Sequence, residues 1–226
     1  RTDPKADYHQ LVANMAGITR SKAKTINLGL AYGMGQGKLA ISLELTIDEA
    51  KALLTTYHHK VPFVKALSNA ASNRAADAGY IRTILGRRCR FNKWEPSDFD
   101  LAKKVSPMDD KEQMALVVER AIQNAREEKQ PAPKMGVRRA FTYRAMNRLI
   151  QGSAADMTKK ALVEVFKAGY VPHIQVHDEL DTSVSSPADV QEISEIMRDA
   201  VPLCVPVRVD AEIGDTWGTV SGTFKW

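Results

Sequence analysis

Three ionisable residues, His177, Asp178 and Glu179, stand together in the segment IQVHDELD. Apolar residues typical of a β-strand lead into them, so the carboxylates are expected at the tip of a hairpin. A carboxylate held by a sheet and open to solvent suits a hard divalent cation, which prefers oxygen ligands and keeps some waters. Because Asp is also common in ordinary turns, the tripeptide alone favours a polar turn, and a metal site would need a second carboxylate from elsewhere.

A cationic stripe is the second chemical feature. In RSKAKTINLGLAYGMG, Arg20, Lys24 and Leu28 recur every four residues and share one side of a helix, drifting towards Tyr32. Two cations near a helix start can hold a polyphosphate, although a solvated basic face is the commoner reason for such spacing. The glycines do not form a Walker A phosphate loop, because Tyr32 and Leu39 occupy the positions that require Gly and Ser or Thr.

The third feature is the segment NRLIQGSAAD. Its Asn147 and Gln151 lie one helical turn apart, and their amides can donate hydrogen bonds to acceptors on base edges. The small residues 152–155 allow another backbone to come close. Taken alone, close helix packing is the favoured interpretation.

Helix and strand signals predict the elements that must position these residues. Four helices are expected early in the chain: residues 7–16, residues 20–33, one opened by a capping box of Thr46 and Glu49, and one from Pro62 to about Asp77. Residues 80–85 are strand-like and precede a basic turn, GRRCR. A strictly alternating strand is expected at 205–213.

The second half is expected to begin with a proline-rich excursion, residues 92–137, around one amphipathic helix that starts at Asp110. A long helix over residues 138–168 follows. The next segment predicts a half-buried hairpin with its turn near Asp178 and Glu179, and Ser186 with Asp189 caps another helix.

Composition bounds the class of protein. The 226 residues allow one large domain or two small ones. The net charge is 32 − 27 = +5, which fits a polyanionic partner without proving one. Cys89 and Cys204 are far apart and in no metal-like spacing, so a reducing compartment is expected. Neither a transmembrane run nor a signal peptide is recognised.

In this order, the segments resemble the family A DNA polymerases, of the bacterial polymerase I and T-odd phage replicase type. The fingers-helix pattern reads Arg20, Lys24, Leu28, Gly29, Tyr32 and Gly33, while QGSAAD and VHDEL resemble the palm signatures nearly letter for letter. DYHQLVANMAGI and GYIRTILGRRCRF resemble two further segments of the family. The resemblance covers residues 1–91 and 138–226, and the excursion at 92–137 has no counterpart in most members.

The resemblance implies an α+β fold in three parts. Residues 1–91 would form a helical fingers subdomain with its nucleotide-binding helix at 20–33. Residues 92–137 would be a helical insertion. Residues 138–226 would form a palm portion with an antiparallel sheet, packed helices and a catalytic hairpin at 171–184.

The implied chemistry is in-line attack of a primer 3′ oxygen on the α-phosphorus of a dNTP, with two Mg²⁺ ions stabilising the attacking and leaving oxygens. The resemblance makes Asp178 a metal ligand and places Glu179 near it. Lys24 is expected to donate a proton to the leaving pyrophosphate. The residues expected to contact the incoming nucleotide are His9, Arg20, Lys24, Leu28 and Tyr32.

DNA-contacting roles follow from the same resemblance. Asn147 and Gln151 would read minor-groove acceptors, which every base pair presents. The other implied positions are Arg87 and Arg88 on the DNA backbone, His177 near the primer end, and Tyr32 with Gly33 beside the templating position.

Leu28 stands where the family usually has Phe or Tyr, whose ring packs against the incoming sugar. Losing the ring removes stacking area, so altered incorporation speed or sugar discrimination is expected, with the fold retained. Single-turnover incorporation by Leu28→Phe tests this expectation. An unchanged rate together with unchanged selectivity would contradict it.

The family's first metal-binding Asp precedes the fingers, and nothing in this chain supplies it. Asp3 and Asp7 are expected in a connecting loop. An upstream portion or partner chain is therefore expected to bring that Asp, the thumb and the rest of the palm. The isolated chain is expected to bind DNA weakly and not to extend primers. Tyr143 also departs from the family, which has Arg there, and Arg144 is a candidate substitute.

Two alternatives remain open. A single-subunit phage-type RNA polymerase shares the helix with Lys and a Tyr-Gly ending, but its palm turn is His-Asp-Ser, whereas this chain has His-Asp-Glu. A non-catalytic nucleic-acid-binding descendant would not need Asp178, Lys24 and Arg20. The resemblance places the protein in the cytoplasm of a bacterium or a phage-infected bacterium, with primer-template DNA, dNTPs and no membrane as partners.

Overall fold

The computed structural model describes residues 7–31 and 34–225. Within these ranges the fold is α+β, with helices interspersed among two-stranded antiparallel sheets. The described chain forms two compact units, residues 7–150 and residues 151–225. None of its helices combines the length and apolar character needed to cross a membrane.

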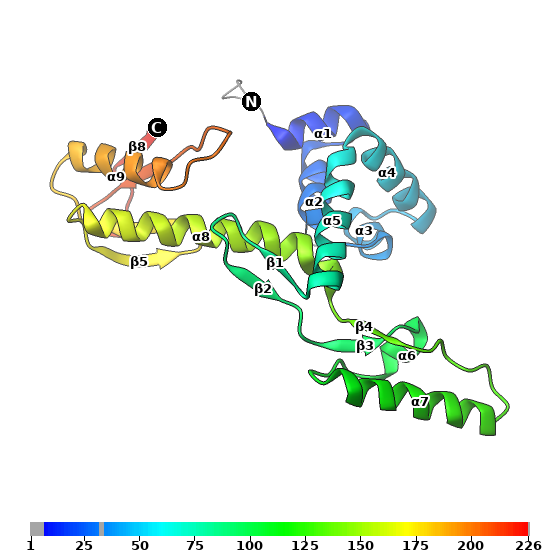
Figure 1. The fold of residues 1–226 in the computed structure, drawn as a ribbon. Helices are drawn as coiled ribbons and strands as arrows, with labels where there is room; N and C mark the ends of the chain where they lie inside the picture. Colours follow the sequence, from blue (N-terminus) through cyan, green and yellow to red (C-terminus); the bar gives the residue numbers. More distant parts are fainter. Residues whose placement is uncertain (1–6, 32–33, 226) are drawn as a thin grey trace. The chain divides into compact units, whose positions relative to one another are not determined.

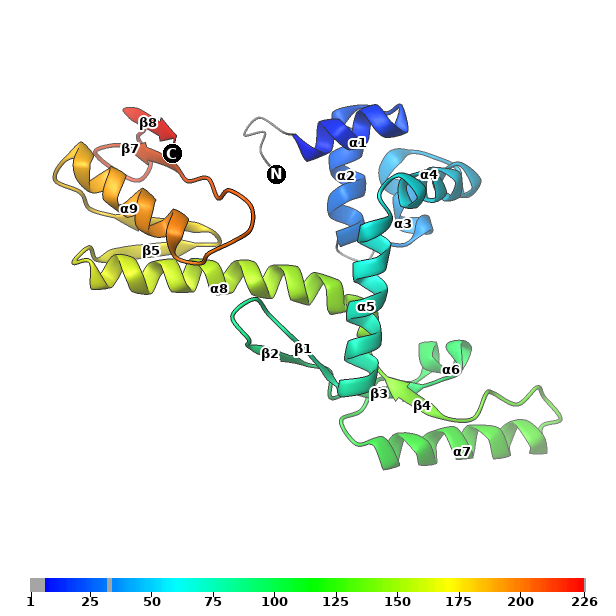
Figure 2. The ribbon, with the colours of Figure 1, turned by 45° about the horizontal axis from the view of Figure 1, so that its top comes forward.

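The first unit opens with five helices (Figure 2). Helix α1 packs on α2, and α4 lies against both α3 and α1. Their shared core contains fully buried Val12, Ile26 and Leu39, together with Tyr57. The bounds are α1 Tyr8–Ala16, α2 Arg20–Ala31, α3 Gln36–Leu43, α4 Ile47–Lys60 and α5 Pro62–Ala78.

Local caps explain why these helices start and stop where they do. The Thr46 side chain accepts from the Glu49 amide and the Glu49 side chain bonds back to Thr46, which confirms the predicted capping box. Pro62 opens α5, also as predicted, and Gly79 ends it with φ of 74°. Sequence reasoning did not predict α3, a short helix capped by glycine at its N-terminus.

The predicted strand at 80–85 and the basic turn after it are corrected by the structure. Strand β1, Tyr80–Arg82, pairs antiparallel with β2, Arg88–Arg90. The reversal lies between them, and Arg87 donates its backbone N–H to the Thr83 hydroxyl oxygen. The last three residues of GRRCR are therefore in a strand. The turn begins before Gly86 because the Thr83 hydroxyl bonds to the Arg87 amide across it.

Residues 92–137 contain one strand and two helices and end at the first residue of a second strand (Figure 1). Strand β3, Trp94–Pro96, pairs with β4, Val137–Arg139. Helix α7, Lys111–Glu127, begins after the predicted cap Asp110 and packs against both strands, with α6, Phe99–Lys104, beside β3. The buried face of α7 carries Met114, Val118 and Ile122.

The predicted helix over 138–168 starts seven residues late. Helix α8 spans Ala145–Lys167, after the 3₁₀ turn Thr142–Arg144. Arg138 instead lies in β4 opposite Glu95, where its Nε is 2.9 Å from Glu95 Oε1. Phe141 has φ of 62°, which separates the strand from the helix.

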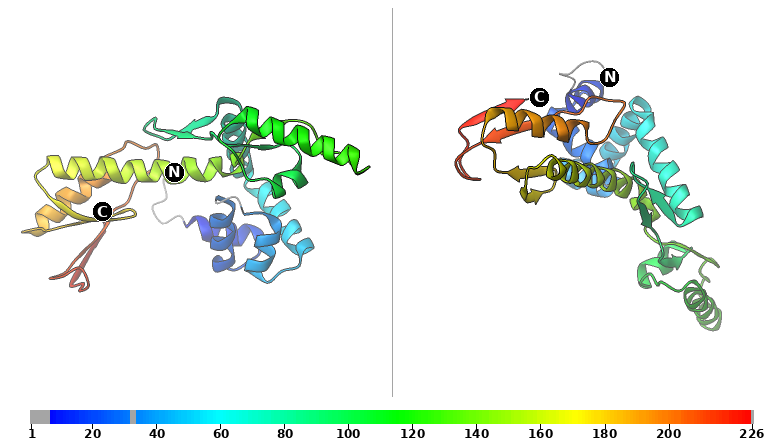
Figure 3. Two further views of the ribbon diagram at one scale, coloured as in Figure 1. Left: turned by 90° about the horizontal axis from the view of Figure 1, so that it is seen from below. Right: turned by 60° about the vertical axis from the view of Figure 1, so that its left-hand side comes forward.

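The second unit continues α8 and adds one helix and two hairpins. Helix α9, Pro187–Asp199, has the predicted capping box of Ser186 and Asp189. Strands β5, Pro172–Val176, and β6, Glu179–Thr182, form one hairpin. Strands β7, Asp210–Ile213, and β8, Gly222–Lys225, form a separate two-stranded sheet (Figure 3). The predicted strand at 205–213 is thus limited to its second half.

The hairpin of β5 and β6 is more exposed than its alternating pattern predicted. Ile174 is 47% exposed and Val176 is 36% exposed in the described structure. Its two-residue turn is His177–Asp178, one position earlier than predicted, because Val176 pairs with Glu179.

Candidate functional site: a cationic helix start and an acidic hairpin tip

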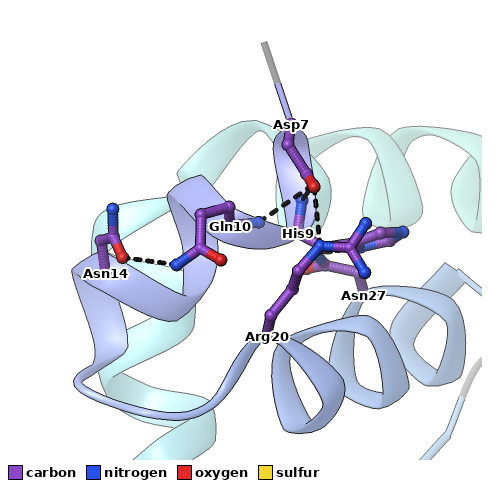
Figure 4. A network of polar contacts seen from close by, with 6 residues as sticks. All are labelled: Asp7, His9, Gln10, Asn14, Arg20 and Asn27. Carbon is purple, nitrogen blue, oxygen red and sulfur yellow. Dashed lines mark hydrogen bonds and ion pairs between the residues drawn. The ribbon is translucent and has the colours of Figure 1, made fainter. Parts of the chain in front are cut away.

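The start of α2 is tied to the start of α1 through Asp7 (Figure 4). One oxygen of the Asp7 carboxylate accepts from the backbone amides of His9 and Gln10. The other lies 2.7 Å from Arg20 Nε. Asp7, predicted to lie in a connecting loop, is therefore the N-cap of α1 and a partner of the predicted phosphate-binding arginine.

His9 is oriented by a residue of α2 that sequence reasoning missed. Asn27 is 7% exposed, and its amide nitrogen lies 2.9 Å from His9 Nδ1. An amide nitrogen can only donate, so Nδ1 accepts and the neutral ring carries its proton on Nε2. The other end of the amide, Asn27 Oδ1, is buried without a hydrogen-bond partner among the described residues. The hydrogen bond to His9 is therefore the one polar contact that orients this side chain in the described structure.

The rest of the predicted stripe faces solvent. Lys24 is exposed and forms no ion pair with any described residue, and Leu28 is 43% exposed. Both follow Arg20 at helical spacing on α2. Tyr32 and Gly33 lie outside the described residues. The described site thus presents a free ammonium, an arginine with one carboxylate partner, and a histidine whose Nε2 has no partner in the described chain.

Arg20→Gln is expected to raise the pKa of the Asp7 carboxyl. Arg20 lowers this pKa below its ordinary value, and the Gln10 amide lowers it further. Because the folded pKa lies below the unfolded one, the ionised carboxylate stabilises the fold at neutral pH, and this contribution is lost as pH falls through the folded pKa. Carbon-detected NMR titration of Asp7 measures the shift. A titration curve identical to that of the parent would contradict the ion pair between Asp7 and Arg20.

The hairpin tip presents its ionisable residues to solvent. His177, Asp178 and Glu179 are all exposed, and neither carboxylate bonds to a described residue. His177 has φ of 52°, a left-handed conformation that is sparsely populated by residues other than glycine. Gln175 supports the turn by donating from Nε2 to the His177 carbonyl at 2.8 Å. Strained residues of this kind cluster at functional sites.

Four of the predicted DNA-contacting residues lie on α8 and at β2, and the fifth, His177, lies in the hairpin turn described above. Helix α8 carries Asn147 and Gln151 one turn apart. The Arg88 guanidinium lies 4.8 Å from the centre of the Tyr80 ring, which Arg74 and Arg82 also approach, at 5.4 and 5.5 Å. Chiefly through Arg74, these cations lower the pKa of Tyr80.

Arg74 and Arg82 were missed by sequence reasoning, as were Asp7 and Asn27. Arg82 lies in the same basic segment as Arg87 and Arg88, and this proximity in sequence could have indicated it. Arg74 and Asn27 lie in ordinary helical sequence, so only the tertiary structure places them beside Tyr80 and His9.

The comparisons with known proteins agree on one family. Residues 5–219 match the family described as DNA polymerase family A, and the chain belongs to this family. It is 36% identical to a DNA-directed DNA polymerase of Pseudomonas phage M6, over 98% of this chain and 32% of that protein. It is 32% identical to the thermostable DNA polymerase I of Thermus filiformis, over 88% of this chain and 20% of that protein.

The fold comparison agrees. The structure matches the POL domain of Pol1 from M. smegmatis, solved in complex with DNA primer-template and dNTP, with a TM-score of 0.63 and 27% identity. This match covers 88% of the present chain and 32% of the other. The chain therefore spans about a third or less of each of these relatives. The phage-type RNA polymerase alternative gains no support from these matches.

Proposed function

We propose that the chain forms the fingers and part of the palm of a template-directed DNA polymerase that adds dNTPs to a primer 3′ end by two-metal phosphoryl transfer. The observation that carries the proposal is a family A chain in which Asp178 is exposed at a strained hairpin tip, without a partner among the described residues, and the cations of α2 face solvent. The relatives described above are DNA polymerases, and one was solved with primer-template DNA and dNTP.

The cations of α2 would receive the triphosphate. Arg20 would exchange its single Asp7 contact for phosphate oxygens, since its planar fork binds phosphate in two places at once. Lys24 would add a point charge and protonate the leaving pyrophosphate. His9 would donate from Nε2, the nitrogen that the Asn27 contact leaves with the proton. Leu28 would pack against the sugar.

The donor set at the hairpin tip fits Mg²⁺. Asp178 and Glu179 offer hard oxygen ligands, and their exposure leaves room for coordinated waters. When bound, Mg²⁺ would stabilise charge on the attacking and leaving oxygens. Asp178 would hold the ion directly, and Glu179 would assist nearby.

The described residues alone do not complete such a centre. They contain no group of three or more His, Cys, Asp or Glu side chains close enough to hold a metal ion. From the family resemblance, in which the first metal-binding Asp precedes the fingers, we propose that a further carboxylate comes from polypeptide outside residues 1–226, together with the thumb and the rest of the palm. We also propose that residues 1–91 form the fingers, residues 92–137 an insertion and residues 138–226 part of the palm.

Primer-template DNA would lie against Asn147, Gln151, Arg87 and Arg88, with His177 near the primer end and Tyr32 and Gly33 beside the templating base. The amides would read acceptors shared by all base pairs, which reports pair shape without sequence preference. We place this activity in the cytoplasm of a bacterium or an infected bacterium.

The direct test is primer extension by the complete polymerase that contains this chain. Extension by the one dNTP complementary to each template base, dependent on Mg²⁺ and with ribonucleotides rejected, is the expected result. Equal use of all four dNTPs on one template base, or preference for ribonucleotides, would contradict the proposal.

A further inference from the structure

A cavity of about 280 Å³ lies in the first unit at the junction between β2, the insertion and the start of α8. Four of its lining side chains are cationic and one is a carboxylate: Arg90, Lys93, Arg144, Arg148 and Asp109. Lys93 and Asp109 belong to the insertion. The cavity does not include His9 or Arg20 of the first two helices, and of its lining residues only Arg144 was given a role above, as a candidate substitute for the family's arginine.

Two arginines of this cavity, Arg144 and Arg148, are held in place without being neutralised. The Arg148 guanidinium lies 4.6 Å from the centre of the Phe91 ring and donates to the Arg90 carbonyl at 3.0 Å. Arg144 lies 4.8 Å from the Phe141 ring and donates from Nε to the Tyr143 hydroxyl at 3.1 Å. These contacts orient the guanidinium planes and leave their positive charge intact.

Carboxylates do little to balance these charges. The single carboxylate, Asp109, is 3.9 Å from Lys93, and both side chains are largely exposed, so the pair is weak. In the described chain, none of the three arginines forms an ion pair. Like charges held around one concave space repel one another, and a bound anion removes that repulsion.

Guanidinium forks match phosphate oxygens in geometry as well as charge. The cavity is about nine times the ~30 Å³ share of one water molecule, so it admits a phosphate with an attached sugar. Phe91 is 3% exposed and so offers no face to a base, and the Arg144 guanidinium already lies 4.8 Å from the centre of the Phe141 ring. The features therefore favour the sugar-phosphate backbone over a nucleobase.

We propose that this cavity is an additional DNA-backbone site, in which Arg144 and Arg148 hold a phosphodiester and the insertion supplies one wall through Lys93. The proposal rests on the polymerase function proposed above. It also gives Arg144, a residue that lines this cavity, a role different from that of the arginine expected at Tyr143.

The test uses the complete polymerase with Arg144→Gln and Arg148→Gln combined, and measures the Kd for primer-template across salt concentrations. The slope of log Kd against log salt should fall by about 1 to 2, since each lost phosphate contact removes ~0.9. Raising the salt from about 50 to about 200 mM increases the Kd of the parent. For each lost contact, this fold-increase in Kd should be smaller by roughly 3.5-fold. Arg120→Gln, an exposed arginine of α7 outside the cavity, is the matched control and should keep the parent slope.

Two further readouts separate the outcomes. If the cavity instead takes a free nucleotide, the double variant would raise the KM for dNTP and leave the DNA salt slope unchanged, which overturns the proposal. Should the double variant misfold in circular dichroism, Arg144→Gln alone must reduce the slope by about 1, or the proposal fails. An active polymerase with a parental slope in these variants refutes the DNA-backbone site alone. A parent without template-directed extension refutes the polymerase function itself.

Discussion

Asp178→Asn is expected to lower the rate of nucleotide incorporation by about 10³-fold or more, because it removes a negative oxygen ligand from the site proposed for Mg²⁺. The carboxylate is exposed and unpaired in the described structure, so the free energy of unfolding should change by no more than about 0.5 kcal/mol. Single-turnover incorporation at saturating dNTP measures the rate, and thermal melting measures stability.

Glu212→Gln is the matched control for this substitution. Glu212 is an exposed carboxylate on β7 in the same unit, and no site role is proposed for it. Its variant should incorporate nucleotides at the parental rate. Comparable rates for Asp178→Asn and Glu212→Gln would show that the hairpin tip does not take part in the reaction.

Asn27→Asp is expected to raise the KM for dNTP by about 10- to 100-fold. The new carboxylate would accept from His9 Nδ1, so the ring proton would move to Nδ1 and the donor at Nε2 would be lost in the neutral ring. A hydrogen bond to a charged group contributes ~1.5–3 kcal/mol, and ~1.4 kcal/mol corresponds to a tenfold change in affinity. Nitrogen-15 NMR of His9 reports the tautomer independently of activity.

Asn14→Asp is the matched control, because it also replaces a side-chain amide by a carboxylate on one of the first two helices. Asn14 is exposed and accepts from Gln10 Nε2 on α1 (Figure 4). Its variant should keep both the parental KM and the parental His9 tautomer. Asn27→Leu, which removes the hydrogen bond without reversing it, should give a smaller rise in KM. If Asn27→Asp left the tautomer and the KM unchanged, Asn27 would have no positioning role.

Local signals predicted much of the fold because caps are encoded within a few residues. Thr46 with Glu49, Ser186 with Asp189, and Asp110 each begin a helix where predicted. The family could also be predicted, because the resemblance depends on several motifs that occur in a fixed order. The comparisons confirm the family.

The errors arose where distant pairing overrides local pattern. Arg138 belongs to a strand because Glu95, far away in sequence, pairs with it. The turn is at His177–Asp178 because Val176 pairs with Glu179. The alternation of apolar and polar residues alone does not fix this register to within one residue. Asn27 and the cationic cavity are tertiary features, and no spacing in the sequence indicates either.

The proposed role of Asp178 as a ligand of catalytic Mg²⁺ can be tested by counting bound metal ions. Mn²⁺ takes the place of Mg²⁺, and electron paramagnetic resonance counts the ions that bind the complete polymerase with primer-template and dNTP. If Asp178 is a ligand, the parent should bind two ions per complex and Asp178→Asn should bind fewer. Two ions bound with unchanged affinity in the variant would show that Asp178 does not hold the metal.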